Sequence, residues 1–337
     1  SYTKPGDPYM VRSHQAEALV NSLKRGTENG RNVVITSGTG SGKTEAFLLP
    51  IFARLIEESL TWPTQRPVVK WWENPSTPWV DLRSDESRPK ALRSLILYPT
   101  NALVEDQITR LRRAVRVLRQ SPDGHQFWFG RYTSATPPGG NAQPRGNGGL
   151  ARIREQAAEL TSMISEFDRL ETGGLDPEFL AQFSDPRKGE MPTRWDMVAA
   201  PPDILVTNYS MLNAMLMRDV ENPLFEQTAD WLSSKENVFT LVMDELHLYR
   251  GTQGSEIAMT LRNLLSRLGL AADSPQLRCL ATSASLSDDS SGLEFLEQFF
   301  GVHRSSFFIT AGEPRSVNEQ LPVSKTSVLD AEANGDD

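Results

Sequence analysis

The chain has 337 residues, 38% of them hydrophobic and 23% charged, a composition typical of a globular protein that buries a core of its own. No apolar run approaches the ~20 residues that cross a bilayer, and the N-terminal residues lack a secretory signal pattern, so we expect a cytoplasmic protein. A single cysteine excludes an intrachain disulfide and argues against a cysteine-rich zinc site. The net charge of -8 counts against a nucleic-acid partner without excluding one, because only the charge on the contacting face matters.

Five short aliphatic runs are typical of parallel strands buried on both faces, because they are continuous rather than alternating. They are Asn32 to Thr36, Ser94 to Tyr98, Asp203 to Thr207, Phe239 to Met243 and Leu277 to Thr282. Helical patterns separate them, and one of these is expected to begin at a Ser255 cap and to end at Gly269. The alternation predicts an α/β fold with a mostly parallel, doubly wound sheet flanked by helices.

Two regions interrupt this alternation and are predicted to be insertions, at about residues 61–90 and 131–200. The first contains a cluster of tryptophans, Trp62, Trp71, Trp72 and Trp79, which we expect to pack together or form a partner surface rather than to stack on bases. The second contains a Gly- and Pro-rich loop at 133–149 and a helical patch at 150–170. Residues 1–310 would form the domain, and the polar residues 311–337 a linker.

The stretch "SGTGSGKT" lies between the first predicted strand and an apolar helix, which is the context of a Walker A phosphate loop. Its small residues would let backbone N–H groups converge on phosphate oxygens. Lys43 would reach the β- and γ-phosphates, and the Thr44 hydroxyl would ligate Mg²⁺. Ser37 stands where the strict pattern has glycine. The predicted nucleotide-binding residues here are Ser37, Gly38, Thr39, Gly40, Ser41, Gly42, Lys43 and Thr44.

An acidic pair, Asp244 and Glu245, follows the fourth predicted strand. Asp244 would hold Mg²⁺, and Glu245 would orient and deprotonate the attacking water. Taken alone, the pair could equally be the acidic start of a helix. Together with the phosphate loop it predicts an ATPase site whose catalytic residues are Lys43, Asp244 and Glu245.

Six motifs, in this order along the chain, resemble those of superfamily 2 DExH-box helicases. They are "RSHQ" (12–15), "SGTGSGKT" (37–44), "LYPTNALVEDQ" (97–107), "TNYSML" (207–212), "DELH" (244–247) and "TSAS" (282–285). The resemblance implies the first RecA-like P-loop NTPase domain of a helicase that uses ATP and Mg²⁺. The wording of "TNYSML" and "DELHLYRGTQGSE" is most similar to large bacterial DExH helicases of DNA repair or phage defence.

By this resemblance, Gln15 would read adenine, while His247, Thr282 and Ser285 would couple the nucleotide state to domain movement. Contacts to a nucleic-acid backbone would come from Pro99, Thr100, Asn101, Thr207 and Asn208. The same threonines and asparagines could instead be plain helix caps. A basic face of the following helix, formed by Arg112, Arg116 and Arg119, is more often solvated than bound to nucleic acid.

The function that follows is an ATP-dependent DNA helicase or translocase acting on single-stranded DNA or a junction. An RNA helicase, and a non-catalytic interaction module that keeps a nucleotide pocket for regulation, remain as alternatives. In such helicases ATP lies between two RecA-like domains, and the second domain supplies arginines to the transition state. We expect that domain beyond residue 337 of the full-length protein, so this chain alone should hydrolyse ATP slowly. Protein partners are also expected.

Overall fold

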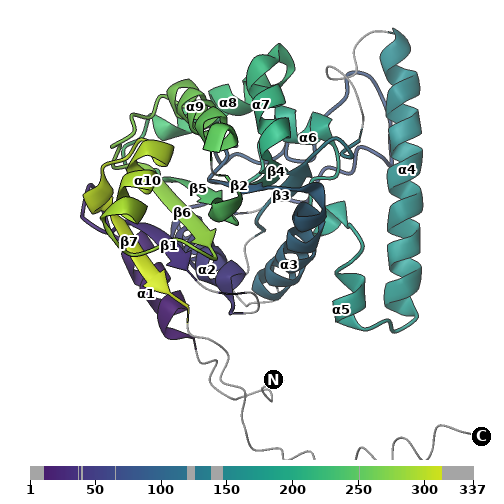
Figure 1. Ribbon diagram of the computed structural model, residues 1–337. Coiled ribbons are helices and arrows are strands. Elements are labelled where there is room, and N and C mark those ends of the chain that lie inside the picture. The colour runs from purple at the N-terminus through teal and green to yellow at the C-terminus, as the bar shows by residue number, and fades with distance from the viewer. Residues whose placement is uncertain are drawn as a thin grey trace, which may run out of the picture.

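A computed structural model describes residues 11–36, 38, 41–64, 66–119, 126–137, 147–249 and 251–312. Its centre is a seven-stranded sheet in which every neighbouring pair is parallel, in the order β3-β4-β2-β5-β6-β1-β7 (Figure 1). The strands are β1 (Asn32–Thr36), β2 (Ser94–Tyr98), β3 (Phe129–Tyr132), β4 (Ile204–Asn208), β5 (Phe239–Met243), β6 (Leu277–Ser283) and β7 (Phe307–Ala311). This confirms the predicted fold class.

Helices cover both faces of the sheet, and alternate residues of each strand enter the two cores. One core contains Val33 and Ile35 and joins the sheet to α1 (Ser13–Ser22), α2 (Lys43–Ser59) and α3 (Asn101–Arg119). The other contains Val34 and packs against the remaining long helices. These are α4 (Asn147–Thr172), α6 (Arg194–Ala199), α7 (Tyr209–Met217), α8 (Asn222–Leu232), α9 (Gly251–Arg267) and α10 (Ser290–Phe300). Among the described residues, no helix is long and apolar enough to cross a membrane.

The five predicted strands are present within a residue at each end, but β3 and β7 were not predicted. Strand β3 is short and contains Gly130 and Arg131, neither of which is typical of a strand. Glycine fits at position 130 because any larger residue would bring its Cβ within 2.4 Å of the sulfur of Met197, which is too close. Helix α9 begins at Gly251, so the predicted cap at Ser255 was wrong, whereas Gly269 does follow the helix with φ 70°.

Three tryptophans of the 61–90 region, Trp71, Trp72 and Trp79, pack together as expected, whereas Trp62 packs apart from them against Phe127. Trp71 and Trp72 are each 5% exposed. The ring of Trp79 lies 5.9 Å from that of Trp71 and 6.1 Å from that of Trp195 on α6, in both cases edge to face. The cluster therefore attaches this region to the sheet domain.

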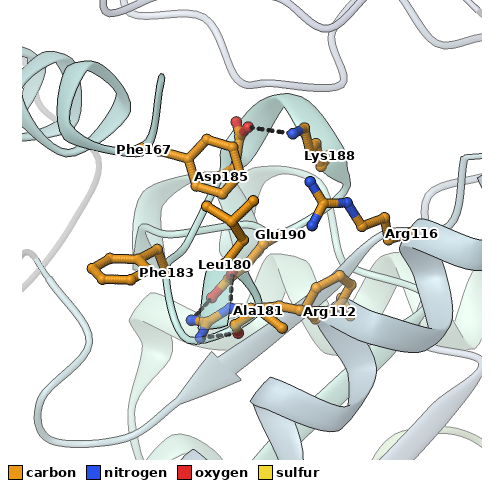
Figure 2. Close-up of a pocket in the computed structure, with 10 residues that line it drawn as sticks. Arg112, Arg116, Phe167, Leu180, Ala181, Phe183, Asp185, Lys188 and Glu190 are labelled. Atoms are coloured by element: carbon orange, nitrogen blue, oxygen red, sulfur yellow. Dashed lines mark hydrogen bonds and ion pairs between the residues drawn. The ribbon is translucent and has the colours of Figure 1, made fainter. Parts of the chain in front are cut away.

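The basic face of α3 anchors the second predicted insertion, so the expectation of solvated arginines was wrong for Arg112 but holds for the exposed Arg119. Arg112 donates from Nε and Nη2 to the two carboxylate oxygens of Glu190, at 2.7 and 2.8 Å (Figure 2). Arg116 pairs with Glu171 at 2.8 Å, and Arg119 donates to the carbonyl of Arg187. The short helices α5 (Pro177–Leu180) and η1 (Pro186–Lys188) lie along this contact.

The segment around Glu190 also continues the hydrogen bonding of the sheet beyond β3. Phe129 donates its N–H to the carbonyl of Gly189 at 2.9 Å and accepts from Met191 N–H at 2.8 Å. An isolated parallel bridge joins Phe129 and Glu190. Helix α4 stands beyond this edge in Figure 1.

Candidate nucleotide and nucleic-acid site

The sequence motifs meet at one edge of the sheet. Because all strands run parallel, their carboxyl ends lie together there, and open α/β sheets bind ligands at that edge. The phosphate loop follows β1, the "DELH" motif follows β5, and "TSAS" lies at the end of β6. Residues far apart in the sequence therefore converge on one site.

The described part of the phosphate loop is held by the "RSHQ" motif. Gln15 donates from Nε2 to the carbonyl of Gly42 at 3.1 Å, and the Arg12 guanidinium donates to the carbonyl of Ser41. Gly42 has φ 84°, and a Cβ there would lie 2.5 Å from Gln15 Nε2, so both conformation and space favour glycine. Gly38 is also described. Ser37, Thr39 and Gly40 lie outside the described residues.

Lys43 begins α2 and joins the phosphate loop to the "DELH" motif. Its Nζ lies 3.1 Å from Glu245 Oε1, and the lysine is only 9% exposed. An ammonium at a helix N-terminus beside backbone N–H groups is suited to bind phosphate oxygens. The pair therefore places a largely buried cation at the end of the phosphate loop next to the glutamate of the "DELH" motif.

Asp244 is tied to the end of β6. The Thr282 hydroxyl donates to Asp244 Oδ1 and accepts from the backbone N–H of Glu245 at 3.0 Å. Burial raises the pKa of Asp244, and the hydrogen bond from Thr282 acts in the opposite direction. Thr282 is completely buried, so the geometry of "TSAS" is linked directly to that of "DELH".

Asp244 and Thr44 fit a magnesium ion that is shared with a nucleotide. No group of three or more acidic, histidine or cysteine side chains in the described part of the chain could hold a metal by itself. Magnesium typically takes one or two protein oxygens and completes its octahedron with phosphates and water. A half-buried hydroxyl and a carboxylate that is 7% exposed match that requirement.

Glu245 is the one described residue other than glycine with a positive φ, at 53°. Such a left-handed conformation costs about 1–2 kcal/mol and is often kept at functional sites. Its Oε2 lies 3.3 Å from His247 Nδ1, which also accepts the backbone N–H of Ala284 at 3.3 Å. His247 thus lies between the predicted base and the "TSAS" segment, and Ser285, beside Ala284, is exposed.

The predicted nucleic-acid contacts divide into exposed and buried groups. Thr100 and Asn101 are exposed, Pro99 is half-buried, and Asn208 donates from Nδ2 to Asn101 Oδ1 at 2.5 Å. Asn208 also caps α7, since its Oδ1 accepts the Met211 N–H at 2.8 Å. Thr207 is completely buried and donates its hydroxyl to the carbonyl of Tyr132 at 2.5 Å. Its hydroxyl is therefore already committed to the sheet.

Two residues were not assigned from the sequence, although both lie inside recognised motifs. Arg12 contacts the phosphate loop, as described above. Gln107, the last residue of "LYPTNALVEDQ", is 5% exposed and has its Nε2 3.5 Å from Thr44 Oγ1. The sequence signal that could have identified Gln107 is a polar residue at a position of α3 that otherwise packs into the core.

The family follows from comparison with known proteins. Residues 12–124 match the DEAD/DEAH box helicase family. The chain carries a DEAD/DEAH box helicase domain. This match starts at the "RSHQ" motif and includes the phosphate loop and "LYPTNALVEDQ", so the predicted recognition is confirmed.

The helicase domain has similar relatives along most of its length. It is 33% identical over 357 residues to Druantia protein DruE of Escherichia coli (strain UMEA 4076-1), covering 93% of this chain and 18% of DruE. ATP-dependent helicase HRQ1 of Saccharomyces cerevisiae is 22% identical over 90% of this chain and 18% of HRQ1. The crystal structure of DUF1998 helicase MrfA matches with a TM-score of 0.50 and 17% identity, over 91% of this chain and 31% of that chain. The helicase domain thus spans less than a third of each relative.

Proposed function

We propose that this helicase ATP-binding domain hydrolyses ATP to drive movement on DNA or its unwinding. The observation that carries the proposal is the 3.1 Å contact between Lys43 and Glu245, because it joins a phosphate-binding lysine to a catalytic base across 202 residues of sequence. Intact Lys43, Thr44, Asp244 and Glu245 argue against a non-catalytic module, since a retired ATPase usually loses one of them.

Each residue has a distinct role in the proposed reaction. Lys43 binds and neutralises the terminal phosphates, while Glu245 orients a water molecule and accepts its proton as the water attacks. Thr44 and Asp244 would hold magnesium, which when bound offsets the negative charge of the phosphates. Gln15 holds the phosphate loop and reads adenine.

Coupling to movement would pass through the end of β6. Thr282 contacts Asp244 and Glu245, and His247 lies within 3.3 Å of both Glu245 and the backbone of Ala284. A change at the phosphates would therefore shift this segment, including Ser285. The predicted domain end at residue 310 is one residue short, because β7 pairs with β1 as far as Ala311 and the Gly312 N–H bonds to the carbonyl of Thr36. We propose that a linker follows this strand and that a second RecA-like domain of the full-length protein completes the site.

The proposed nucleic-acid surface comprises Pro99, Thr100, Asn101 and Asn208, with Thr207 contributing its backbone only. Exposed hydroxyl and amide groups beside helix N-termini suit contacts to a sugar-phosphate backbone. DNA is the proposed substrate, in keeping with the resemblance to large bacterial helicases of DNA repair or phage defence. RNA is the second candidate, because 90 residues are 38% identical to DEAD-box ATP-dependent RNA helicase 13 of Oryza sativa subsp. japonica. Competition between DNA and RNA oligonucleotides for the full-length protein distinguishes the two.

The decisive experiment replaces Glu245 in the full-length protein. Glu245→Gln should lower DNA-stimulated ATP hydrolysis at least about 100-fold while nucleotide binding persists, because the amide cannot accept the proton. The matched control is Glu236→Gln at an exposed position, which should leave the rate unchanged. Turnover at the wild-type rate in Glu245→Gln would show that another group is the base. A wild-type protein that binds ATP but never hydrolyses it would favour the non-catalytic alternative.

A further inference from the structure

Gln107 connects two helices that serve different parts of the proposed site. It lies on α3 with its amide in the contact with α2, where Nε2 is 3.5 Å from Thr44 Oγ1 and 3.5 Å from Asp106 Oδ2. Both distances are at the long limit for a hydrogen bond, so a small rotation of the amide decides the strength of the contact with Thr44. At 5% exposure the amide has little access to competing water.

Helix α3 is already fixed to α2 by charged groups nearer the surface. Arg110 donates to Glu45 Oε1 at 3.1 Å and to Asp106 Oδ2 at 3.2 Å. Of these two exposed pairs, Arg110–Asp106 lies within α3, whereas Arg110–Glu45 joins α3 to α2 without Gln107. The buried glutamine is therefore not needed to attach α3 to α2, and its position against the magnesium-ligand candidate Thr44 asks for a more specific role.

The N-terminus of α3 belongs to the proposed nucleic-acid surface. The helix begins at Asn101, whose Oδ1 accepts from Asn208. A single helix thus has a nucleic-acid candidate at its first residue and Gln107 against the phosphate loop. A displacement of α3 would change both contacts together.

A second buried polar group, Tyr98, lies on the same face of the sheet. Tyr98, at the end of β2, is completely buried in the core that α2 and α3 cover. Its hydroxyl has no hydrogen-bond partner among the described residues. Burial raises the pKa of Tyr98 well above its ordinary value, and the negative charge of Asp244 raises it further.

We propose that Gln107 is a positioning residue that hydrogen-bonds to the Thr44 hydroxyl and orients its oxygen toward magnesium. The inference rests on the proposed function, because it presumes an ATP site that uses Mg²⁺. A hydroxyl oxygen has two lone pairs, so it can accept from Gln107 with one and face the cation with the other. Through the rigid α3, the same contact makes the magnesium site sensitive to nucleic acid held at Asn101 and Asn208.

The test compares Gln107→Met with a matched control in the full-length protein. Methionine keeps the length and packing of the side chain but removes the amide. Gln156→Met is the control, because Gln156 is also 5% exposed but lies on α4 and pairs with Glu159. The measurement is the affinity for AMPPNP in Mg²⁺ and in EDTA, each with and without a single-stranded DNA oligonucleotide.

Gln107→Met should weaken binding about tenfold in Mg²⁺ and leave the affinity in EDTA unchanged, as expected for a group that orients a metal ligand. The effect of DNA on nucleotide affinity should shrink toward no effect, and by linkage the effect of AMPPNP on DNA affinity should shrink by the same factor. In a Thr44→Ala background, Gln107→Met should have no further effect. Gln156→Met should match the wild type throughout.

Two results would overturn the inference. One is a Gln107→Met protein whose ratio of affinities in Mg²⁺ and EDTA equals that of the wild type. The other is a Gln107→Met substitution that weakens AMPPNP binding as much in the Thr44→Ala background as in the wild type. If Gln107→Met does not fold, Gln107→Asn replaces it, since the shorter amide stays polar but cannot reach Thr44. Failure of the wild type to bind AMPPNP at all would instead overturn the proposed function.

Discussion

Buried charges lie at both edges of the sheet where strands begin and end, and they are paired to different degrees at the amino ends and at the carboxyl ends of the strands. Where β4 begins, Asp203 accepts from Arg88 at 2.7 and 2.8 Å, from Arg93 at 3.1 Å and from the Trp128 N–H at 2.8 Å. At the opposite edge, Lys43 and Glu245 share a single contact of 3.1 Å, and the Glu245 side chain is 22% exposed. Both edges exclude most water, but only the first has a fully bonded carboxylate.

The difference separates a structural use of charge from a functional one. A buried ion pair contributes to stability only when its carboxylate is well hydrogen-bonded, and Asp203 accepts from two arginines and a backbone N–H. At the nucleotide edge, donors and acceptors keep bonding capacity for phosphate, water and a cation, and the backbone of Glu245 retains strain. Changes at the first edge should therefore affect folding, and changes at the second should affect ligand chemistry.

The largest expected effect is at Asp203. Asp203→Asn should lower the free energy of unfolding by about 3–5 kcal/mol, because it removes the one fully buried carboxylate that Arg88 and Arg93 share and leaves them only the less buried Glu86 and Glu58. Urea unfolding followed by circular dichroism measures the change. Asp168→Asn is the matched control: Asp168 also accepts two hydrogen bonds from one arginine, Arg187, but is exposed, so the cost should be below about 1 kcal/mol. Equal losses in the two variants would contradict the contrast between burial and exposure.

A second prediction uses another buried aspartate, Asp196 on α6. It is completely buried and accepts from the Leu82 N–H, the Trp71 indole and the Thr193 hydroxyl, none of them charged. Burial raises its pKa to about 7, whereas the arginines around Asp203 overcome burial and lower the pKa of that carboxyl. The contribution of Asp196 to stability is thus fully present below about pH 4 and is lost as the pH rises through about 7.

Asp196→Asn should accordingly remove this pH dependence. Between about pH 4 and 7, the free energy of unfolding of the wild type should fall relative to that of the variant. Asp203 does not interfere, because its contribution is lost only in stronger acid, as the pH falls through its lowered pKa. Parallel curves for the two proteins over this range would mean that Asp196 stays ionised in the fold.

The smallest expected effect concerns the strain at Glu245. Glu245→Gly should be more stable than Glu245→Ala by about 1 kcal/mol, because only glycine adopts a positive φ without steric cost. Both variants lose the contact to Lys43, so the comparison isolates the backbone. At Glu297, inside α10, the order should reverse, because glycine is unfavourable in a helix. A Glu245→Ala protein as stable as Glu245→Gly would show that the backbone there relaxes.

Much of this arrangement could be predicted from the sequence, for identifiable reasons. Continuous aliphatic runs gave five strands, and a parallel sheet requires the motifs that follow them to meet at one edge. The short β3 lacked that pattern, because Gly130 was selected by contact with Met197 rather than by strand propensity. The burial of Thr207 and the contact of Gln107 with Thr44 depend on how separate elements pack, which residue spacing does not specify. The basic face of α3 was misjudged in part for the same reason.

The bridge between Phe129 and Glu190 has a consequence for solubility. An exposed edge strand presents unpaired N–H and C=O groups that can pair with another molecule and begin aggregation. The segment 189–191 occupies the N–H and C=O of Phe129 at the start of β3, and the Arg112–Glu190 pair keeps it there. A shortened protein that lacks the residues between β3 and β4 would therefore expose a sheet edge. For this chain, the second insertion protects the monomer against edge-to-edge association.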